Sequence, residues 1–107
     1  MKKLLLVFLL LLMCGCSGEK TFDEIIKENN YIIVDVRTKE EYSQGHVVDA
    51  INIPYDELDS SLDKNKTIIV YCQSGKRSKV AYDLLVNMGY DVYDLGSYNT
   101  ITLEKTS

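Results

Sequence analysis

One segment of the chain has residue types suited to nucleophilic chemistry. It is Tyr71-Cys-Gln-Ser-Gly-Lys-Arg-Ser78, in which a cysteine is followed by one glycine and two basic residues. The apolar run before it predicts a strand that ends at Tyr71, and a helix is expected to begin about Arg77 or Ser78. Gly75 permits the tight turn between them. Backbone N–H groups in such a loop and the positive end of the following helix favour an anion or a thiolate. The segment therefore predicts that Cys72 is a nucleophile.

A structural interpretation of the same cysteine is that it is a small apolar side chain buried at the end of a strand, which is a common role for a free cysteine. The glycine and the two basic residues of the loop favour the reactive interpretation, because such surroundings stabilise a thiolate. A redox role is disfavoured, since the predicted mature chain has no second cysteine to resolve a disulfide.

The amino-terminal residues have the pattern of an export signal rather than of a folded segment. Two lysines precede ten apolar residues, 4–13, which are too few to span a bilayer because a membrane helix needs roughly 20. The segment Met13-Cys-Gly-Cys16 resembles the lipobox of bacterial lipoproteins. We expect a signal peptide over 1–15, a lipidated Cys16 with a tether over 16–20, and a domain over 21–107. The alternative is an ordinary signal peptide and a free secreted product.

Either alternative places the domain outside the cytoplasm, and the lipobox predicts a lipid anchor in the bacterial cell membrane. Removal of residues 1–15 would leave ten basic and sixteen acidic residues, a formal charge of −6. This acidic balance argues against nucleic-acid binding, which needs clustered basic residues, but it permits a local site for a small anion. One histidine and one free cysteine cannot supply a zinc site, so no metal or cofactor is expected.

The rest of the chain alternates between helix and strand signals. Capping boxes at Thr21-Phe-Asp-Glu24 and Thr38-Lys-Glu-Glu41 predict two helix starts. Strands are expected over 31–35, 50–53, 67–71 and 91–95, one or two helical turns over 56–62, and a helix over 78–88. The apolar stripe of that last helix would comprise Val80, Ala81, Leu84, Leu85 and Met88. This alternation predicts an α/β fold with a mainly parallel sheet covered on both faces.

Three segments together resemble the rhodanese domain family, over nearly the whole predicted mature chain. They are Asp35-Val-Arg37, Glu41-Tyr-Ser-Gln-Gly-His-Val-Val-Asp-Ala-Ile-Asn-Ile-Pro54, and Cys72-Gln-Ser-Gly-Lys-Arg-Ser78. The resemblance implies a three-layer α/β/α fold with helices flanking the central sheet. It also implies a single-domain sulfurtransferase in which Cys72 takes sulfur from a small anionic donor such as thiosulfate. A thiol or a cyanide-like acceptor would then remove the sulfur from the Cys72 persulfide.

The resemblance also assigns roles to individual residues. The substrate-binding loop would comprise Gln73, Ser74, Gly75, Lys76, Arg77 and Ser78. Within it, Arg77 would steer the anionic donor, whereas Lys76 is equally well explained as a solvated surface charge. Asp35 and Arg37 are interpreted as an ion pair or hydrogen-bonded set that fixes the loops. His46 is interpreted as a capping and packing residue.

Two positions depart from the family pattern. Asp49 stands where a glycine is usual, and Gly96-Ser-Tyr98 replaces the usual glycine pair. Neither departure is expected to touch the active loop. They instead concern the packing of the loop after residue 46 and of the carboxyl-terminal segment, which could border the pocket.

Two other functional classes stay open, and the domain is expected to be a monomer. One is a phosphatase-like or arsenate-reductase-like hydrolase, although only four residues separate Cys72 from Arg77, one fewer than in that signature. The other is a non-enzymatic persulfide carrier or binding module.

Overall fold

The computed structural model describes residues 20–107, so the predicted signal peptide, Cys16 and most of the tether lie outside the described part. No helix among the described residues is long and apolar enough to cross a membrane. The elements are α2 (Phe22–Glu28), β1 (Tyr31–Asp35), α3 (Lys39–Ser43), β2 (His46–Val47), β3 (Ile51–Asn52), a 3₁₀ turn (Tyr55–Glu57), β4 (Thr67–Cys72), α4 (Lys76–Asn87), β5 (Val92–Ser97), a second 3₁₀ turn (Tyr98–Thr100) and β6 (Lys105–Thr106).

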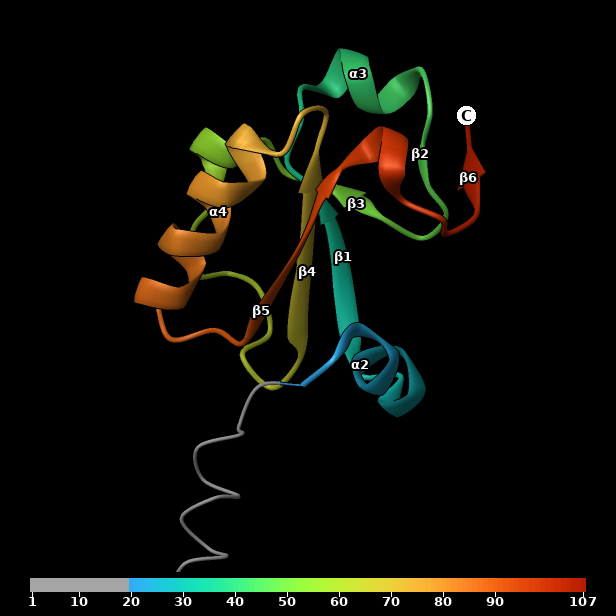
Figure 1. Cartoon of the computed structure of the whole chain (residues 1–107). Coiled ribbons are helices and arrows are strands. Elements are labelled where there is room, and N and C mark those ends of the chain that lie inside the picture. Colours follow the sequence, from blue (N-terminus) through green and yellow to red (C-terminus); the bar gives the residue numbers. More distant parts are fainter. Residues whose placement is uncertain (1–19) are drawn as a thin grey trace, which may run out of the picture.

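The main sheet has the order β3-β1-β4-β5, and every neighbouring pair is parallel. Figure 1 shows the carboxyl ends of its strands at one end of the molecule, where the β4–α4 loop and α3 also lie, with α2 at the opposite end. Parallel strands bring their carboxyl ends to one edge, which is where ligands bind in open α/β sheets. The predicted parallel sheet is confirmed, and its topology places the Cys72 loop at this edge.

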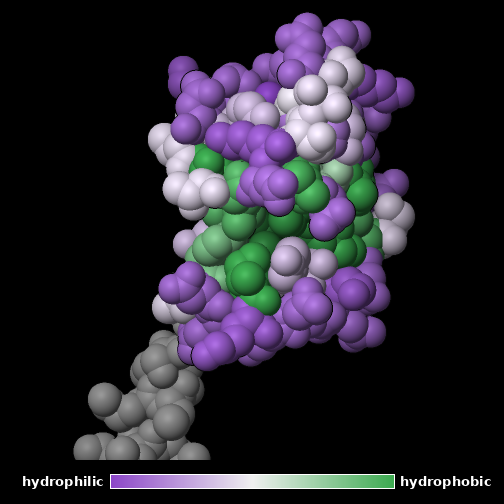
Figure 2. Space-filling view, turned by 90° about the vertical axis from the view of Figure 1, so that its right-hand side faces the viewer, coloured by the Kyte–Doolittle hydropathy of each residue, from purple (hydrophilic) through white to green (hydrophobic). Residues whose placement is uncertain are grey.

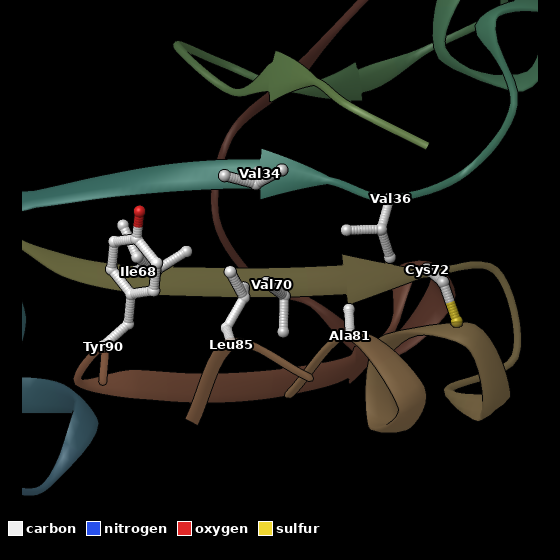
Figure 3. Close-up of a cluster of buried hydrophobic side chains, with 8 residues drawn as sticks. All are labelled: Val34, Val36, Ile68, Val70, Cys72, Ala81, Leu85 and Tyr90. Carbon is white, nitrogen blue, oxygen red and sulfur yellow. The ribbon is translucent and has the colours of Figure 1, made fainter. Parts of the chain in front are cut away.

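Side chains alternate between the two faces of the sheet, and each face has its own core. The α4 face buries Val34, Val36, Ile68, Val70, Cys72, Ala81, Leu85 and Tyr90 (Figure 3). The opposite face buries Ile25, Ile33, Val47, Ala50, Ile69, Tyr71 and Ile101. Continuous β-branched runs suit strands that are covered on both faces. Helices flank the sheet as predicted.

Both capping boxes form as the sequence indicates. The Thr21 hydroxyl accepts a bond from the Glu24 N–H, while the Glu24 carboxylate accepts from the Thr21 N–H. Thr38 and Glu41 repeat this arrangement at the start of α3. These reciprocal bonds satisfy N–H groups that have no partner inside the helix.

The prediction for α4 was wrong in its start and in its apolar stripe. The helix begins at Lys76 rather than at Arg77 or Ser78, because Gly75 serves as its N-cap. Val80 is 52% exposed and Leu84 is 37% exposed, although the periodicity puts both on the stripe. The sheet covers only a narrow band of the helix, centred on its buried Ala81 and Leu85, so the flanking apolar positions face solvent.

Two further predictions needed correction. The helical turns expected over 56–62 reduce to the single 3₁₀ turn Tyr55–Glu57, after which Leu58 and Leu62 pack against the α4-side core. The carboxyl-terminal tail is also more structured than expected. Its strand β6 pairs antiparallel with β2, joining Lys105 to Val47. A two-residue strand leaves almost no periodicity in a sequence, so this pairing was missed.

The edge of the main sheet at β3 is short. Figure 2, which views the molecule from the side where β3 and β6 lie in Figure 1, shows hydrophobic side chains across the middle of this face and hydrophilic ones at both ends. Ile51 of β3 is 42% exposed. A two-residue edge strand offers few free backbone groups for pairing with another chain.

Candidate active site

Cys72 is the last residue of β4 and is fully buried. Its sulfur is turned toward the loop that leads into α4 (Figure 3). The Gly75 N–H donates to the Cys72 Sγ at 2.9 Å. The burial of Cys72 agrees with its interpretation as a small apolar core residue. The loop N–H that donates to its sulfur agrees instead with its interpretation as a nucleophile. The second feature distinguishes this cysteine from an ordinary core residue, because such a donor stabilises negative charge on sulfur.

Gly75 shapes the loop through its backbone conformation. Its φ of +95° lies in the region that residues with a Cβ rarely adopt. A Cβ built there would meet only atoms of Gly96 and Ser97 at ordinary contact distances, so conformation rather than space requires glycine. The Gly75 carbonyl accepts from the Ser78 hydroxyl at 3.1 Å and from the Lys79 N–H at 3.2 Å. These bonds join the loop to the first turn of α4.

Arg37 fastens three segments together and is only 3% exposed. Its Nε and Nη2 donate to the Asp35 carboxylate, its Nη2 also donates to the Gly45 carbonyl at 2.6 Å, and its Nη1 donates to the Gln73 Oε1 at 3.0 Å. The guanidinium carbon also lies 4.4 Å from the centre of the Tyr98 ring. Burial opposes the charge of Arg37, but the hydrogen bonds and charge of Asp35 outweigh it and raise the pKa. The geometry agrees with the interpretation of Asp35 and Arg37 as residues that fix the loops.

Tyr71 completes this buried network beside the cysteine. Its hydroxyl donates to Asp35 Oδ2 at 2.8 Å and accepts from the Val47 N–H at 3.0 Å. Burial raises the pKa of Tyr71 above its ordinary value, and the bond to Asp35 acts in the same direction. No buried side-chain nitrogen or oxygen within residues 20–107 lacks a hydrogen-bond partner. The support under the loop is therefore fully hydrogen-bonded, which favours one rigid arrangement.

Arg77 is engaged by a carboxylate. Its Nη1 and Nη2 donate to the two oxygens of Glu41 at 2.8 Å and 3.1 Å. This pairing raises the pKa of Arg77 and, with help from Thr38, lowers the pKa of Glu41 to about 2. The sequence interpretation assigned Arg77 to the donor anion and did not identify Glu41 as its partner. Among the described residues of the loop, Lys76 is the basic side chain that forms no ion pair, and it is exposed.

His46 lies in β2 and contacts the end of α3. Its Nδ1 is 3.0 Å from the Tyr42 carbonyl oxygen, and the two rings stack with centroids 3.8 Å apart. This arrangement agrees with the predicted capping and packing role.

The carboxyl-terminal departure from the family pattern touches the loop, contrary to the expectation. The Ser97 hydroxyl donates to the Gln73 carbonyl oxygen at 2.8 Å, and the Tyr98 ring stacks on Tyr71. Ser97 and Tyr98 were therefore missed as site residues. The sequence carried one signal for them: they follow Gly96 at the end of the strand that neighbours β4, and parallel strands end at the same edge.

The site combines one thiol, the N–H of Gly75 on its sulfur and the exposed charge of Lys76. This set is suited to stabilising a thiolate and attracting a small anion. Within residues 20–107, no group of three His, Cys, Asp or Glu side chains could hold a metal ion.

Comparison with known proteins assigns the fold and the reaction class. Residues 19–103 match the rhodanese-like domain family. The chain is 41% identical over 78 residues to thiosulfate sulfurtransferase PspE of Escherichia coli, covering 67% of this chain and 75% of that protein. It is 32% identical to thiosulfate sulfurtransferase GlpE of Coxiella burnetii over 82 residues, 72% of this chain and 77% of that one. A solved rhodanese with anions from E. coli superposes with a TM-score of 0.68 at 38% identity, over 72% of this chain and 98% of that chain. The chain therefore belongs to the rhodanese-like domain family and is a rhodanese-type sulfurtransferase.

Proposed function

We propose that this sulfurtransferase carries sulfur as a persulfide on Cys72, with a thiosulfate-like anion as donor. The Cys72 thiolate attacks the outer sulfur of thiosulfate, a new S–S bond forms, and sulfite leaves with the electron pair of the broken bond. A thiol or cyanide then attacks the terminal sulfur, and the thiolate is regenerated. No oxidant or reductant is needed besides donor and acceptor.

The contact between the Gly75 N–H and the Cys72 sulfur carries this proposal. A fixed N–H aimed at sulfur stabilises the thiolate and, after transfer, the charge on the persulfide. The two thiosulfate sulfurtransferases named above support thiosulfate as the donor class. The similar E. coli rhodanese was solved with anions, which agrees with an anionic donor.

Full burial of Cys72 means that a donor reaches the sulfur only when part of its covering moves. Within the loop, Ser74 and Lys76 are the exposed residues, so they form its solvent side. The donor would approach over this side, where the charge of Lys76 attracts an anion.

The engagement of Arg77 weighs against the hydrolase alternative. A hydrolase of this type needs its arginine to bind the oxyanion, whereas here the Nη1 and Nη2 of Arg77 both donate to the carboxylate of Glu41. A persulfide carrier would use the same loop geometry and differs from a transferase in its acceptor and its turnover.

The test is intact-mass spectrometry of residues 17–107 after incubation with thiosulfate, beside Cys72→Ser. This segment contains residues 19–103, which match the family. The superposition on the solved E. coli rhodanese, over 72% of this chain, already covers 98% of that chain. We expect a gain of one sulfur atom that requires Cys72 and disappears with cyanide as thiocyanate is released. Repeated thiocyanate release would favour an enzyme over a stoichiometric carrier. No adduct from thiosulfate or polysulfide would overturn the persulfide mechanism.

The cellular location rests on the lipobox-like segment alone. In this proposal residues 1–15 are removed, Cys16 is acylated and residues 17–20 tether the domain outside the cytoplasm of a bacterial cell. Cys16→Ala should abolish incorporation of labelled palmitate and release the protein from the membrane fraction, whereas Cys14→Ala should do neither. Equal release of both variants, or of the unmodified protein, would contradict a lipid anchor at Cys16.

A further inference from the structure

Ser97 stands out because its side chain bonds the main chain of the loop that holds Cys72. The Ser97 Oγ donates to the carbonyl oxygen of Gln73 at 2.8 Å. Arg37 holds the side chain of the same glutamine through Oε1 at 3.0 Å. The residue after Cys72 is thus fastened at both its main chain and its side chain. The family pattern described above has glycine in this region, whereas this chain has a serine.

A β-bulge in β5 brings Ser97 to the correct face. Val70 of β4 pairs with Asp94, but the next residue, Tyr71, pairs with Gly96, so one extra residue lies in β5. Because side chains alternate along a strand, the extra residue reverses the faces of all later positions. Ser97 consequently pairs with Cys72 and shares its face of the sheet. Gly96, with φ at +82°, and its N–H bond to the Asp94 carboxylate at 2.8 Å form this bulge.

The peptide group between Gln73 and Ser74 explains what the contact achieves. In a trans peptide the C=O and N–H bonds point in opposite directions, and no peptide bond in the described chain is cis. A carbonyl that turned toward the sulfur would repel a thiolate, whereas the N–H group would attract it. The Ser97 hydroxyl holds the Gln73 carbonyl in one direction. Because the Ser74 N–H belongs to the same peptide, it is thereby fixed in the opposite direction.

We propose that Ser97 is a positioning residue of the sulfur-transfer reaction. It locks the Gln73–Ser74 peptide so that the Gln73 carbonyl stays bonded to Ser97 and the Gly75 N–H keeps its bond to the sulfur of Cys72. This inference rests on the proposed persulfide mechanism. Ser97 acts through the loop and does not touch the reacting atoms.

The test compares Ser97→Ala with Ser97→Thr, which keeps a hydroxyl, in steady-state transfer from thiosulfate to cyanide. We expect Ser97→Ala to lower kcat by about fivefold or more. This is the factor to which the net free energy of one hydrogen bond corresponds. KM should change less than twofold, because the donor is attracted by other groups. Ser97→Thr should restore most of kcat.

Thr100→Ala is the matched control. Its hydroxyl donates to the Ser97 carbonyl in the same segment and reaches no loop atom. This variant should keep kcat, and all the variants should have similar melting temperatures. An unchanged kcat in Ser97→Ala, an equal loss in Thr100→Ala, or a loss that Ser97→Thr does not restore would overturn the proposal.

Amide hydrogen exchange by NMR separates this proposal from the persulfide mechanism. The Gly75 N–H should exchange faster in Ser97→Ala than in the unmodified domain, because its bond to sulfur depends on the fixed loop. If the unmodified domain forms no persulfide, the mechanism fails, and the exchange rate alone decides the role of Ser97. In that case, an unchanged exchange rate of the Gly75 N–H in Ser97→Ala would overturn the role proposed for Ser97.

Discussion

Arg77 and Glu41 form a two-bond ion pair that joins the first turn of α4 to α3, across 36 residues of sequence. Both side chains are about one-third exposed, at 29% and 32%. The pair holds α3 beside the loop of Cys72 and neutralises the second arginine near the sulfur. Arg37 is paired with Asp35 in the same way. The two arginines therefore hold the elements around the loop in position and add no net positive charge to the site.

The ion pair predicts a particular dependence of stability on pH. Its hydrogen bonds lower the pKa of Glu41 from 4.5 to about 2 in the folded protein. The stabilisation is therefore fully present above pH 4.5 and is lost as the pH falls through about 2. Glu41→Gln, which can still complete the capping box, should lower the free energy of unfolding at pH 7 by about 0.5 kcal/mol, because solvent screens such a pair.

Urea unfolding at a series of pH values measures this difference. The gap between the unmodified protein and Glu41→Gln should shrink below pH 4.5 and close near pH 2. Glu40→Gln on the same short helix serves as the control and should show a smaller gap. A gap that is the same at pH 7 and pH 2 would exclude the ion pair as its source.

The buried arginine should behave differently from the exposed one. Arg37→Lys removes the planar fork that reaches Asp35, Gly45 and Gln73, and it leaves buried acceptors unpaired. We expect a loss of about 3 kcal/mol in the free energy of unfolding. Arg77→Lys should cost less than about 1 kcal/mol. Chemical denaturation of both variants provides the comparison, and equal losses would show that burial does not set the cost.

Lys76 should determine attraction of the donor anion if thiosulfate is the donor. Lys76→Ala should raise KM for thiosulfate by about threefold to tenfold at low ionic strength, and added salt should reduce the effect because it screens exposed charges. Lys79→Ala, which removes an exposed charge from the next turn of α4, should change KM by less than twofold. If the two substitutions raised KM equally, the donor would be attracted by the overall charge of this surface rather than by Lys76.

Asp49 carries a conformational cost that a glycine would remove. Its φ is +69°, in the left-handed region, at the position where the family pattern has glycine. Asp49→Gly should raise the free energy of unfolding by up to about 1 kcal/mol, because a residue with a Cβ is strained there. Asp49→Ala removes the carboxylate but keeps the Cβ, so it should give no gain. Thermal unfolding of the three proteins decides the matter, and a gain in the alanine variant would attribute the effect to charge.

The amino-acid sequence by itself determined the local features of this protein. Two capping boxes, two β-branched strands and the loop of Cys72 could be predicted because each depends on residues within a few positions of one another. The order of strand, loop and helix also placed the cysteine at the carboxyl edge of a parallel sheet. Asp35 and Arg37 could be assigned as support because they lie two residues apart at the end of a strand.

Tertiary structure alone decided which side chains complete the site. Glu41 reaches Arg77 across 36 residues and Ser97 reaches Gln73 across 24, and no local pattern links these positions. The face that Ser97 presents depends on one extra residue in β5, which is visible only once the strands are paired. The exposure of Val80 was likewise set by how little of α4 the sheet covers. Long-range register and packing area are properties of the assembled sheet, and for that reason the sequence identified the nucleophile but not the residues that hold its loop.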